Sequence, residues 1–156
     1  MAKVERLGVE RSAEMADLHA ACFAAQETWS SGAFSDVLSL PTTYARGIFE
    51  ADRLRAFALI QFVAGDAEIL TLATAPEARQ RGLAREILQS LQEELAPLGL
   101  EKWLLEVAAD NSGAITFYQR LGFQTDGERR NYYKRLEGGA VNAILMSKPA
   151  GRQAPD

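Results

Sequence analysis

Glu106 interrupts the apolar run WLLEV (residues 103–107), a pattern that predicts a buried strand. Burying an ionised carboxylate is costly unless the carboxylate is paired, and burial favours its protonated form. A carboxylate held in such surroundings is a candidate general base, able to take a proton from an attacking nucleophile. A structural glutamate whose oxygens are hydrogen-bonded at a strand end explains the same residue about as well.

Asn111 and Tyr118 are seven residues apart in a segment that predicts a short helix, so their side chains are expected on one helix face. A tyrosine hydroxyl, with a pKa of about 10, can donate a proton to a departing group. Each residue also has a simpler structural explanation. Asn111 would be the N-cap of the helix, and Tyr118 a core residue whose hydroxyl finds a partner.

The segment RQRGLA (residues 79–84) places two arginines and a glycine where an amphipathic helix is expected to begin. The first amides of a helix have no intrahelical partner, and the helix dipole favours an anion beside them. The arginines would add charge-assisted hydrogen bonds to a phosphate. The segment matches neither a Walker loop nor a dinucleotide-binding fingerprint. Taken alone, it favours an anion site only slightly over a simple arginine-rich loop.

The composition argues against a general nucleic-acid or membrane-surface binder. The 156 residues carry a formal net charge of −4 and a single cysteine, Cys22, which excludes an intramolecular disulfide. The charged N-terminus resembles no signal peptide, and no apolar run is long enough to span a bilayer. His19 and Cys22 are three residues apart without a further cluster, so no metal site is predicted. We expect a cytoplasmic protein.

The elements that must position these residues follow from hydrophobic periodicity and turn residues. Strands are predicted over residues 4–9, 44–50, 54–64, 68–74, 102–109, 123–133 and 141–149. Helices are predicted after Ser12 as N-cap, within 27–38, over 83–95, and from Asn111 to Leu121 with Gly122 as the left-handed residue that ends it. These elements predict one α+β domain over residues 1–149 and a disordered tail over residues 150–156.

The order of these segments gives them a common meaning. A strand ending near Pro76, then RQRGLA, a helix, LLEVAADN and ITFYQRLGF together resemble the GNAT superfamily of acyl-CoA N-acyltransferases. The loop signature of that superfamily, Arg/Gln-x-x-Gly-x-Gly/Ala, is matched by Arg79, Gly82 and Ala84. The resemblance covers nearly the whole chain. It implies a mixed, mostly antiparallel six- to seven-stranded sheet flanked by about four helices, with a splayed cofactor cleft between the fourth and fifth strands.

Within the superfamily, the chain resembles the bacterial ribosomal-protein alanine N-acetyltransferases through AEILTLATAPEARQRGLA, WLLEVAADNSGAITFYQRLGF, RRNYY and TWS. This implies metal-independent acetyl transfer from acetyl-CoA to a protein N-terminal α-amine, most specifically the alanine of a small-subunit ribosomal protein. A monomer or weak dimer is expected, without nucleic-acid or membrane partners. Two alternatives stay open: a GNAT enzyme for a lysine or small-molecule amine, and a non-catalytic acyl-CoA-binding regulatory module.

The resemblance also implies a role for each matching residue. Glu106 matches the general base, which would deprotonate an amine of pKa about 8. Tyr118 matches the general acid that protonates the departing thiolate. The residues implied to contact acetyl-CoA are Leu72, Ala73, Thr74, Arg79, Gln80, Arg81, Gly82, Leu83, Ala84, Asn111 and Tyr118. The residues hypothesised to wall the acceptor groove are Trp29, Phe34, Tyr132 and Tyr133.

Three residues depart from the family pattern. Ala84 replaces the usual final glycine of the loop signature, as some members allow. Thr74 and Ala108 stand where the related sequences often carry valine and arginine. Both positions are expected near the acceptor site, so they bear on the choice of acceptor. A backbone amide near Ala73 or Thr74 is the expected hydrogen-bond donor to the thioester oxygen.

Overall fold

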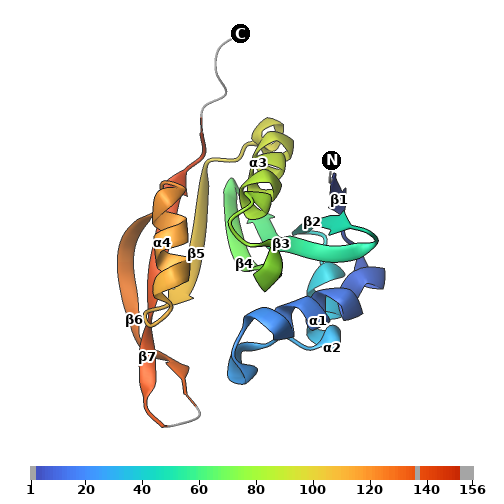
Figure 1. Cartoon of the computed structure of the whole chain (residues 1–156). Coiled ribbons are helices and arrows are strands. Elements are labelled where there is room, and N and C mark those ends of the chain that lie inside the picture. Colours follow the sequence, from blue (N-terminus) through green and yellow to red (C-terminus); the bar gives the residue numbers. More distant parts are fainter. Residues whose placement is uncertain (1–2, 136–137, 152–156) are drawn as a thin grey trace.

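The computed structural model describes residues 3–135 and 138–151, which contain a seven-stranded sheet of order β1-β2-β3-β4-β5-β7-β6 (Figure 1). Neighbouring strands are antiparallel except for β4 and β5, which are parallel. The predicted mixed, mostly antiparallel sheet is therefore confirmed. The strands are β1 (Val4–Arg6), β2 (Thr43–Glu50), β3 (Arg53–Val63), β4 (Asp66–Thr74), β5 (Lys102–Ala108), β6 (Gln124–Lys134) and β7 (Ala140–Pro149).

Helices cover both faces of the sheet. Residues 56–60 of β3 are all buried, although successive residues of a strand point to opposite faces, because α1 and α3 both pack on this strand. α3 presents a buried stripe that includes Leu83, Ile87 and Leu91. The helices are α1 (Ser12–Cys22), α2 (Ser31–Leu38), α3 (Leu83–Leu95) and α4 (Ser112–Arg120), with 3-10 turns η1 (Val9–Arg11), η2 (Ala25–Glu27), η3 (Pro76–Ala78) and η4 (Ala96–Leu98).

The parallel strands β4 and β5 pair over only part of their length. Their register runs from Asp66 opposite Lys102 to Ile69 opposite Leu105, and no pairing continues beyond that point in the described residues. At the same place β4 contains an irregularity: Ile69 and Thr71 oppose consecutive residues of β3, so Leu70 has no partner there. The two strands therefore separate, which confirms the predicted cleft between the fourth and fifth strands.

Local structure differs from the sequence-based prediction in two places. Ser12 was predicted to be the N-cap of α1, but it is the first helical residue, and its hydroxyl donates to the carbonyl of Val9 at 2.7 Å. The 3-10 turn η1 leads directly into the helix and replaces the end of the predicted first strand. β5 was predicted to be buried on both faces, but Leu104 and Glu106, which share one face of the strand, are partly exposed, and Glu106 lines the open cleft.

Two further observations concern the C-terminal end of the domain and the length of its helices. β7 ends at Pro149, while residues 152–156 of the predicted disordered tail lie outside the described residues. None of the helices described in the structure is both long and apolar enough to cross a membrane.

Candidate active site

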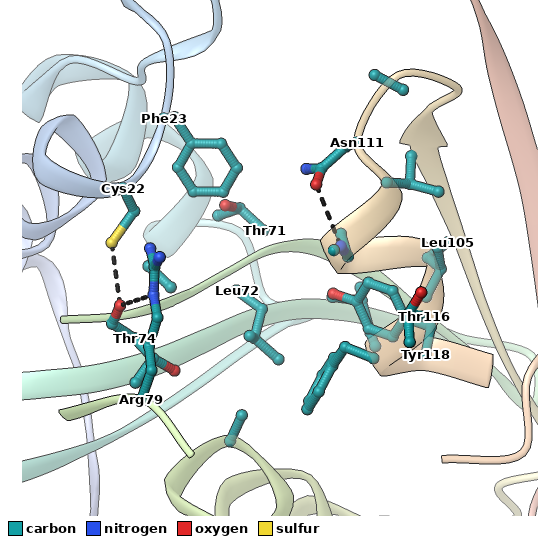
Figure 2. A pocket seen from close by; sticks show the side chains of 18 of the residues that line it. Cys22, Phe23, Thr71, Leu72, Thr74, Arg79, Leu105, Asn111, Thr116 and Tyr118 are labelled. Carbon is teal, nitrogen blue, oxygen red and sulfur yellow. Dashed lines mark hydrogen bonds between the residues drawn. The ribbon is translucent and has the colours of Figure 1, made fainter. Parts of the chain in front are cut away.

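A cleft of about 1170 Å³ occupies the space between the separated halves of β4 and β5. Its walls come from α1, the end of β4, the loop at residues 79–82 with the start of α3, the end of β5, and α4. Figure 2 shows Thr71 and Leu72 of β4 on one side of the space, with Asn111, Thr116 and Tyr118 on the other. The cleft exists because the sheet opens here and a helix follows each of the two strands.

The loop before α3 forms the end of this cleft that is best suited to an anion. Gln80 and Gly82 have positive φ angles of 63° and 77°, so the chain turns sharply twice before the helix starts. Gly82 is the N-cap of α3, and none of the described side chains caps the first turn. The amides of that turn are therefore available to a ligand, at the positive end of the helix dipole.

The two arginines of the loop lie in different surroundings. Arg79 lines the cleft, and its Nε donates to the carbonyl of Thr74 at 3.2 Å. Arg81 instead pairs with Glu50 of β2, with Nη1 donating to Oε1 at 3.0 Å, and it is not among the residues that line the cleft. Of the implied cofactor-contacting residues, the structure brings all to the cleft except Arg81, which the ion pair turns toward the β2–β3 hairpin.

Glu106 and Tyr118 reach the same cleft from β5 and α4. The sequence context predicted a buried Glu106 carboxylate, but the side chain is 24% exposed, and Oε1 lies 3.1 Å from Nη2 of Arg129. Tyr118 is buried, with its ring packed edge-on against Phe123 and its hydroxyl turned toward β4 (Figure 2). Burial raises the pKa of Tyr118, so its hydroxyl keeps its proton at neutral pH.

Asn111 is the N-cap of α4, because its Oδ1 accepts from the amide of Ala114 at 3.1 Å. The same side chain lines the cleft. Since Oδ1 is engaged by the helix, the amide NH₂ is the group that Asn111 offers to a ligand. Gly122, with φ of 101°, follows the helix in the predicted left-handed conformation.

The four aromatic residues hypothesised to wall an acceptor groove separate into two groups. Trp29 and Tyr133 line the cleft. Phe34 is fully buried, packed against Trp29 and Phe57 with ring centroids 5.1 and 5.6 Å away, so it cannot contact a substrate directly. Tyr132 is half-exposed and lies outside the cleft lining, where it meets the ring of Tyr133. Phe34 instead supports Trp29 from within the core.

His19 is a cleft residue that the sequence offered only as a weak metal-ligand candidate. Its Nδ1 accepts from the backbone N–H of Trp29 at 3.2 Å, so Nε2 must carry the ring proton and donate to Thr71 Oγ1 at 2.9 Å. Its ring stacks on Phe23 with centroids 4.1 Å apart. The position of a histidine on the apolar face of α1 could have indicated a buried residue. It could not have identified the partners of His19, because Thr71 is distant in the sequence. His19 ties the segment that carries Trp29 to β4.

Acidification is expected to destabilise the protein through His19. Burial lowers the pKa of His19 to about 4, whereas an unfolded chain protonates it near 6.5. The unfolded state therefore binds the proton first, and the free energy of unfolding should fall by about 2 kcal/mol between pH 7 and pH 5 from this residue. Urea unfolding at both pH values measures the change. The His19→Gln variant should lack this part of the pH dependence. An equal fall in the free energy of unfolding in the two proteins would contradict the role given to His19.

Comparison with known proteins identifies the class. The family model described as Acetyltransferase (GNAT) family matches residues 12–123, more than half of the chain. The chain therefore belongs to the acetyltransferase (GNAT) family, as predicted. The fold agrees: Arabidopsis thaliana NAA60, solved in complex with acetyl-CoA, superposes with a TM-score of 0.80 at 15% identity, covering 96% of this chain and 98% of that one.

Within the family, the chain is similar to RimI-type enzymes. It is 41% identical over 98 residues to the ribosomal protein bS18-alanine N-acetyltransferase of Salmonella typhimurium, covering 63% of this chain and 66% of that protein. It is 31% identical over 140 residues to the N-alpha-acetyltransferase RimI of Mycobacterium tuberculosis, covering 87% and 85%. The match thus spans slightly less than two thirds of the Salmonella relative. The crystal structure of the Escherichia coli ribosomal-protein-S18-alanine N-acetyltransferase superposes with a TM-score of 0.86 at 28% identity, covering 99% and 97%.

Proposed function

We propose that this chain transfers an acetyl group from acetyl-CoA to the N-terminal α-amine of a protein, specifically the N-terminal alanine of a small-subunit ribosomal protein. The observation that carries this proposal is the convergence of Glu106 and Tyr118 on one cleft that also ends in the amide-rich loop before α3. The similarity to a ribosomal protein bS18-alanine N-acetyltransferase supports the ribosomal acceptor, and the similarity to an N-alpha-acetyltransferase supports the α-amine. A single domain over residues 1–149 would carry out this acetyl transfer in the cytoplasm.

The residues present fit acetyl-CoA as a cosubstrate. The turns at Gln80 and Gly82 and the first amides of α3 would hold the pyrophosphate, with Arg79 close by. The separated edge of β4 at Leu72, Ala73 and Thr74 would pair with the extended arm, as an added strand does. Acetyl-CoA supplies an acetyl thioester to the nucleophile. A backbone amide near Ala73 or Thr74 is the proposed donor to the thioester oxygen.

The chain's own residues would move two protons. Glu106, directly or through a water molecule, would take a proton from the acceptor amine, which has a pKa of about 8 and is mostly protonated at neutral pH. Arg129, which contacts the Glu106 carboxylate, would hold that carboxylate in place between turnovers. Tyr118 would give its proton to the departing thiolate. Holding both substrates in one cleft would supply much of the rate acceleration, so no covalent enzyme intermediate is required.

Gly82 is expected to matter for cosubstrate binding because of its left-handed conformation. Its φ is 77°, and an added Cβ would meet no atom within 4 Å, so the requirement is conformational rather than steric. Gly82→Ala should cost about 1–2 kcal/mol of strain or shift the loop, which corresponds to about tenfold weaker binding of acetyl-CoA. Calorimetric titration measures the dissociation constant. Gly127→Ala, also without neighbours around its Cβ but with no positive φ, is the matched control.

The acceptor can be identified by labelling. The purified protein is incubated with isotopically labelled acetyl-CoA and bacterial proteins whose N-termini are unblocked. The modified positions are then identified by mass spectrometry. Label on the N-terminal alanine of a small-subunit ribosomal protein supports the proposal. Label confined to lysine side chains or to free small amines would replace it with the corresponding GNAT activity. Thr74 and Ala108 both line the cleft, so their side chains bear on this choice.

A non-catalytic acyl-CoA-binding module is the second candidate, favoured only by the generality of the fold. It predicts binding of acetyl-CoA without transfer to any member of the peptide and amine panel. Simultaneous placement of a carboxylate and a protonated tyrosine in the cleft has no role in such a module, which is why we favour the enzyme.

A further inference from the structure

Arg135, the residue that follows β6, makes an ion-pair network that the proposed chemistry does not use. Its Nε and Nη2 donate to the two carboxylate oxygens of Asp110 at 2.9 and 2.6 Å. Its Nη1 donates to Glu27 Oε1 at 2.6 Å. The guanidinium also lies 5.8 Å from the ring centroid of Tyr133. The side chains of Arg135 and Glu27 are only 12% and 22% exposed, so their contact is shielded from water more than an ordinary surface pair, whereas Asp110 is 48% exposed.

The three partners come from segments that surround the cleft on the side of Trp29. Glu27 belongs to η2, two residues before Trp29, and both residues line the cleft. Asp110 lies between β5, which carries Glu106, and Asn111, the N-cap of α4. Tyr133 of β6 lines the cleft as well. We call the part of the chain before Pro76 and the part after Glu101 the two arms of the molecule. In Figure 1, α1 of the first arm and the β6–β7 hairpin of the second lie apart, and η2, which carries Glu27, follows α1 in the chain.

The contact between Arg135 and Glu27 has no equivalent elsewhere in the described chain. Among the side chains that the structure describes, it is the one hydrogen bond or ion pair that joins the segment before Pro76 to the segment after Glu101. Backbone pairing between the two arms stops at Ile69 and Leu105. Beyond that point, backbone pairing no longer sets the distance between the two arms, and the contact of Arg135 with Glu27 connects them. None of its hydrogen bonds involves the anion-binding loop at residues 79–84.

We propose that Arg135 is a positioning residue for the acceptor: by holding Glu27 against Asp110, it sets the width of the cleft at the entrance used by the acceptor amine. This inference rests on the proposed acetyl transfer and assigns to that site a residue for acceptor binding. The geometry places the acceptor between Trp29 and Tyr133, in an opening whose two rims Arg135 connects. The loop that would hold acetyl-CoA is anchored separately, by α3 and β4.

The test separates acceptor binding from cosubstrate binding. Steady-state kinetics are measured for the full-length protein with an alanine-starting peptide and acetyl-CoA, each varied in turn, in the wild type and in Arg135→Gln. We expect the KM for the peptide to rise about tenfold, as when a distant contact misplaces a substrate. The KM for acetyl-CoA should stay within about twofold, because only the acceptor subsite is changed.

Two further variants make the result specific. Glu27→Gln should raise the peptide KM in the same direction, and the double variant should be little worse than Arg135→Gln alone, because both substitutions break one contact. Arg130→Gln removes an equally charged, exposed side chain from β6 that makes no ion pair in the described structure, and it should leave both KM values unchanged. Arg135→Lys keeps the charge but not the bidentate geometry, and should recover part of the loss.

The outcomes distinguish this inference from the proposed function. An unchanged peptide KM in Arg135→Gln overturns the inference, and so does an equal rise of both KM values, which indicates general loss of structure. If the wild type acetylates small amines and no peptide, the proposed acceptor is wrong. The same comparison is then made with the amine, and an unchanged KM for that amine overturns the role of Arg135.

Discussion

Replacing Glu106 by glutamine is expected to lower kcat by about 10²- to 10⁴-fold while leaving acetyl-CoA binding nearly intact. Glutamine keeps the size of the side chain and a carbonyl oxygen within reach of Arg129, but it cannot accept a proton from the amine. The defect should shrink as the pH approaches and passes about 8, because the acceptor amine then loses its proton without help. Thiol release from acetyl-CoA, followed across this pH range, measures both effects.

A matched substitution controls for loss of charge. Glu128→Gln changes an exposed carboxylate on β6 that hydrogen-bonds to Asn142 and does not line the cleft, and it should leave kcat unchanged. If Glu106→Gln reduces the rate by the same factor at every pH, its carboxylate does not act as the base. If the rate is unchanged, Glu106 has no part in the mechanism.

Tyr118→Phe is expected to lower kcat by about 10²-fold, the smallest loss typical of removing a general acid. The phenylalanine ring can keep the contacts with Phe117 and Phe123, so folding should be preserved. Burial raises the pKa of the Tyr118 hydroxyl, so wild-type activity should show no decline from its ionisation between pH 7 and the ordinary tyrosine value of about 10. Single-turnover kinetics at saturating acetyl-CoA, together with thermal unfolding, separate chemistry from stability.

The control for Tyr118 is Tyr44→Phe, which deletes a hydroxyl from a residue of β2 that packs against Phe62 and does not line the cleft. Its kcat should match the wild type. A Tyr118→Phe protein with full activity would remove the hydroxyl from the mechanism and leave the thiolate to depart unprotonated. Full activity in both Glu106→Gln and Tyr118→Phe would mean that positioning alone carries the reaction. Absence of transfer in the wild type, with acetyl-CoA bound, would favour the binding module.

Much of the fold follows from local sequence. The strands around residues 44–50, 54–64 and 68–74 alternate or stay apolar over the lengths that strands need, and short polar turns separate them. α3 was predictable from its apolar stripe, and Asn111 from its position before a helix, since an N-cap is read from neighbouring residues. Ser12 was equally plausible as a cap, but the preceding 3-10 turn engages its hydroxyl, and a local pattern does not show that turn.

The candidate site was predictable only in part. The order of the motifs pointed to residues that meet in the cleft, Glu106 and Tyr118 among them. Their surroundings were not predictable, because the partners are distant in the chain. Arg129 reaches Glu106 from the final hairpin, and Glu50 turns Arg81 away from the cleft. Phe34 was predicted to face a substrate, but it lies in the core beneath Trp29.

The sequence by itself determined the order of strands and helices along the chain, the arginine- and glycine-containing loop before a helix, and the residue types that acetyl transfer needs. These properties depend on neighbours in the chain, where residue type and spacing carry the information. Only the tertiary structure decided which carboxylate is paired, which aromatic residues reach the cleft, and that Arg135 joins Glu27 across it. Those contacts join residues as far as 108 positions apart, and their geometry is set by the packing of whole elements after the sheet opens between β4 and β5.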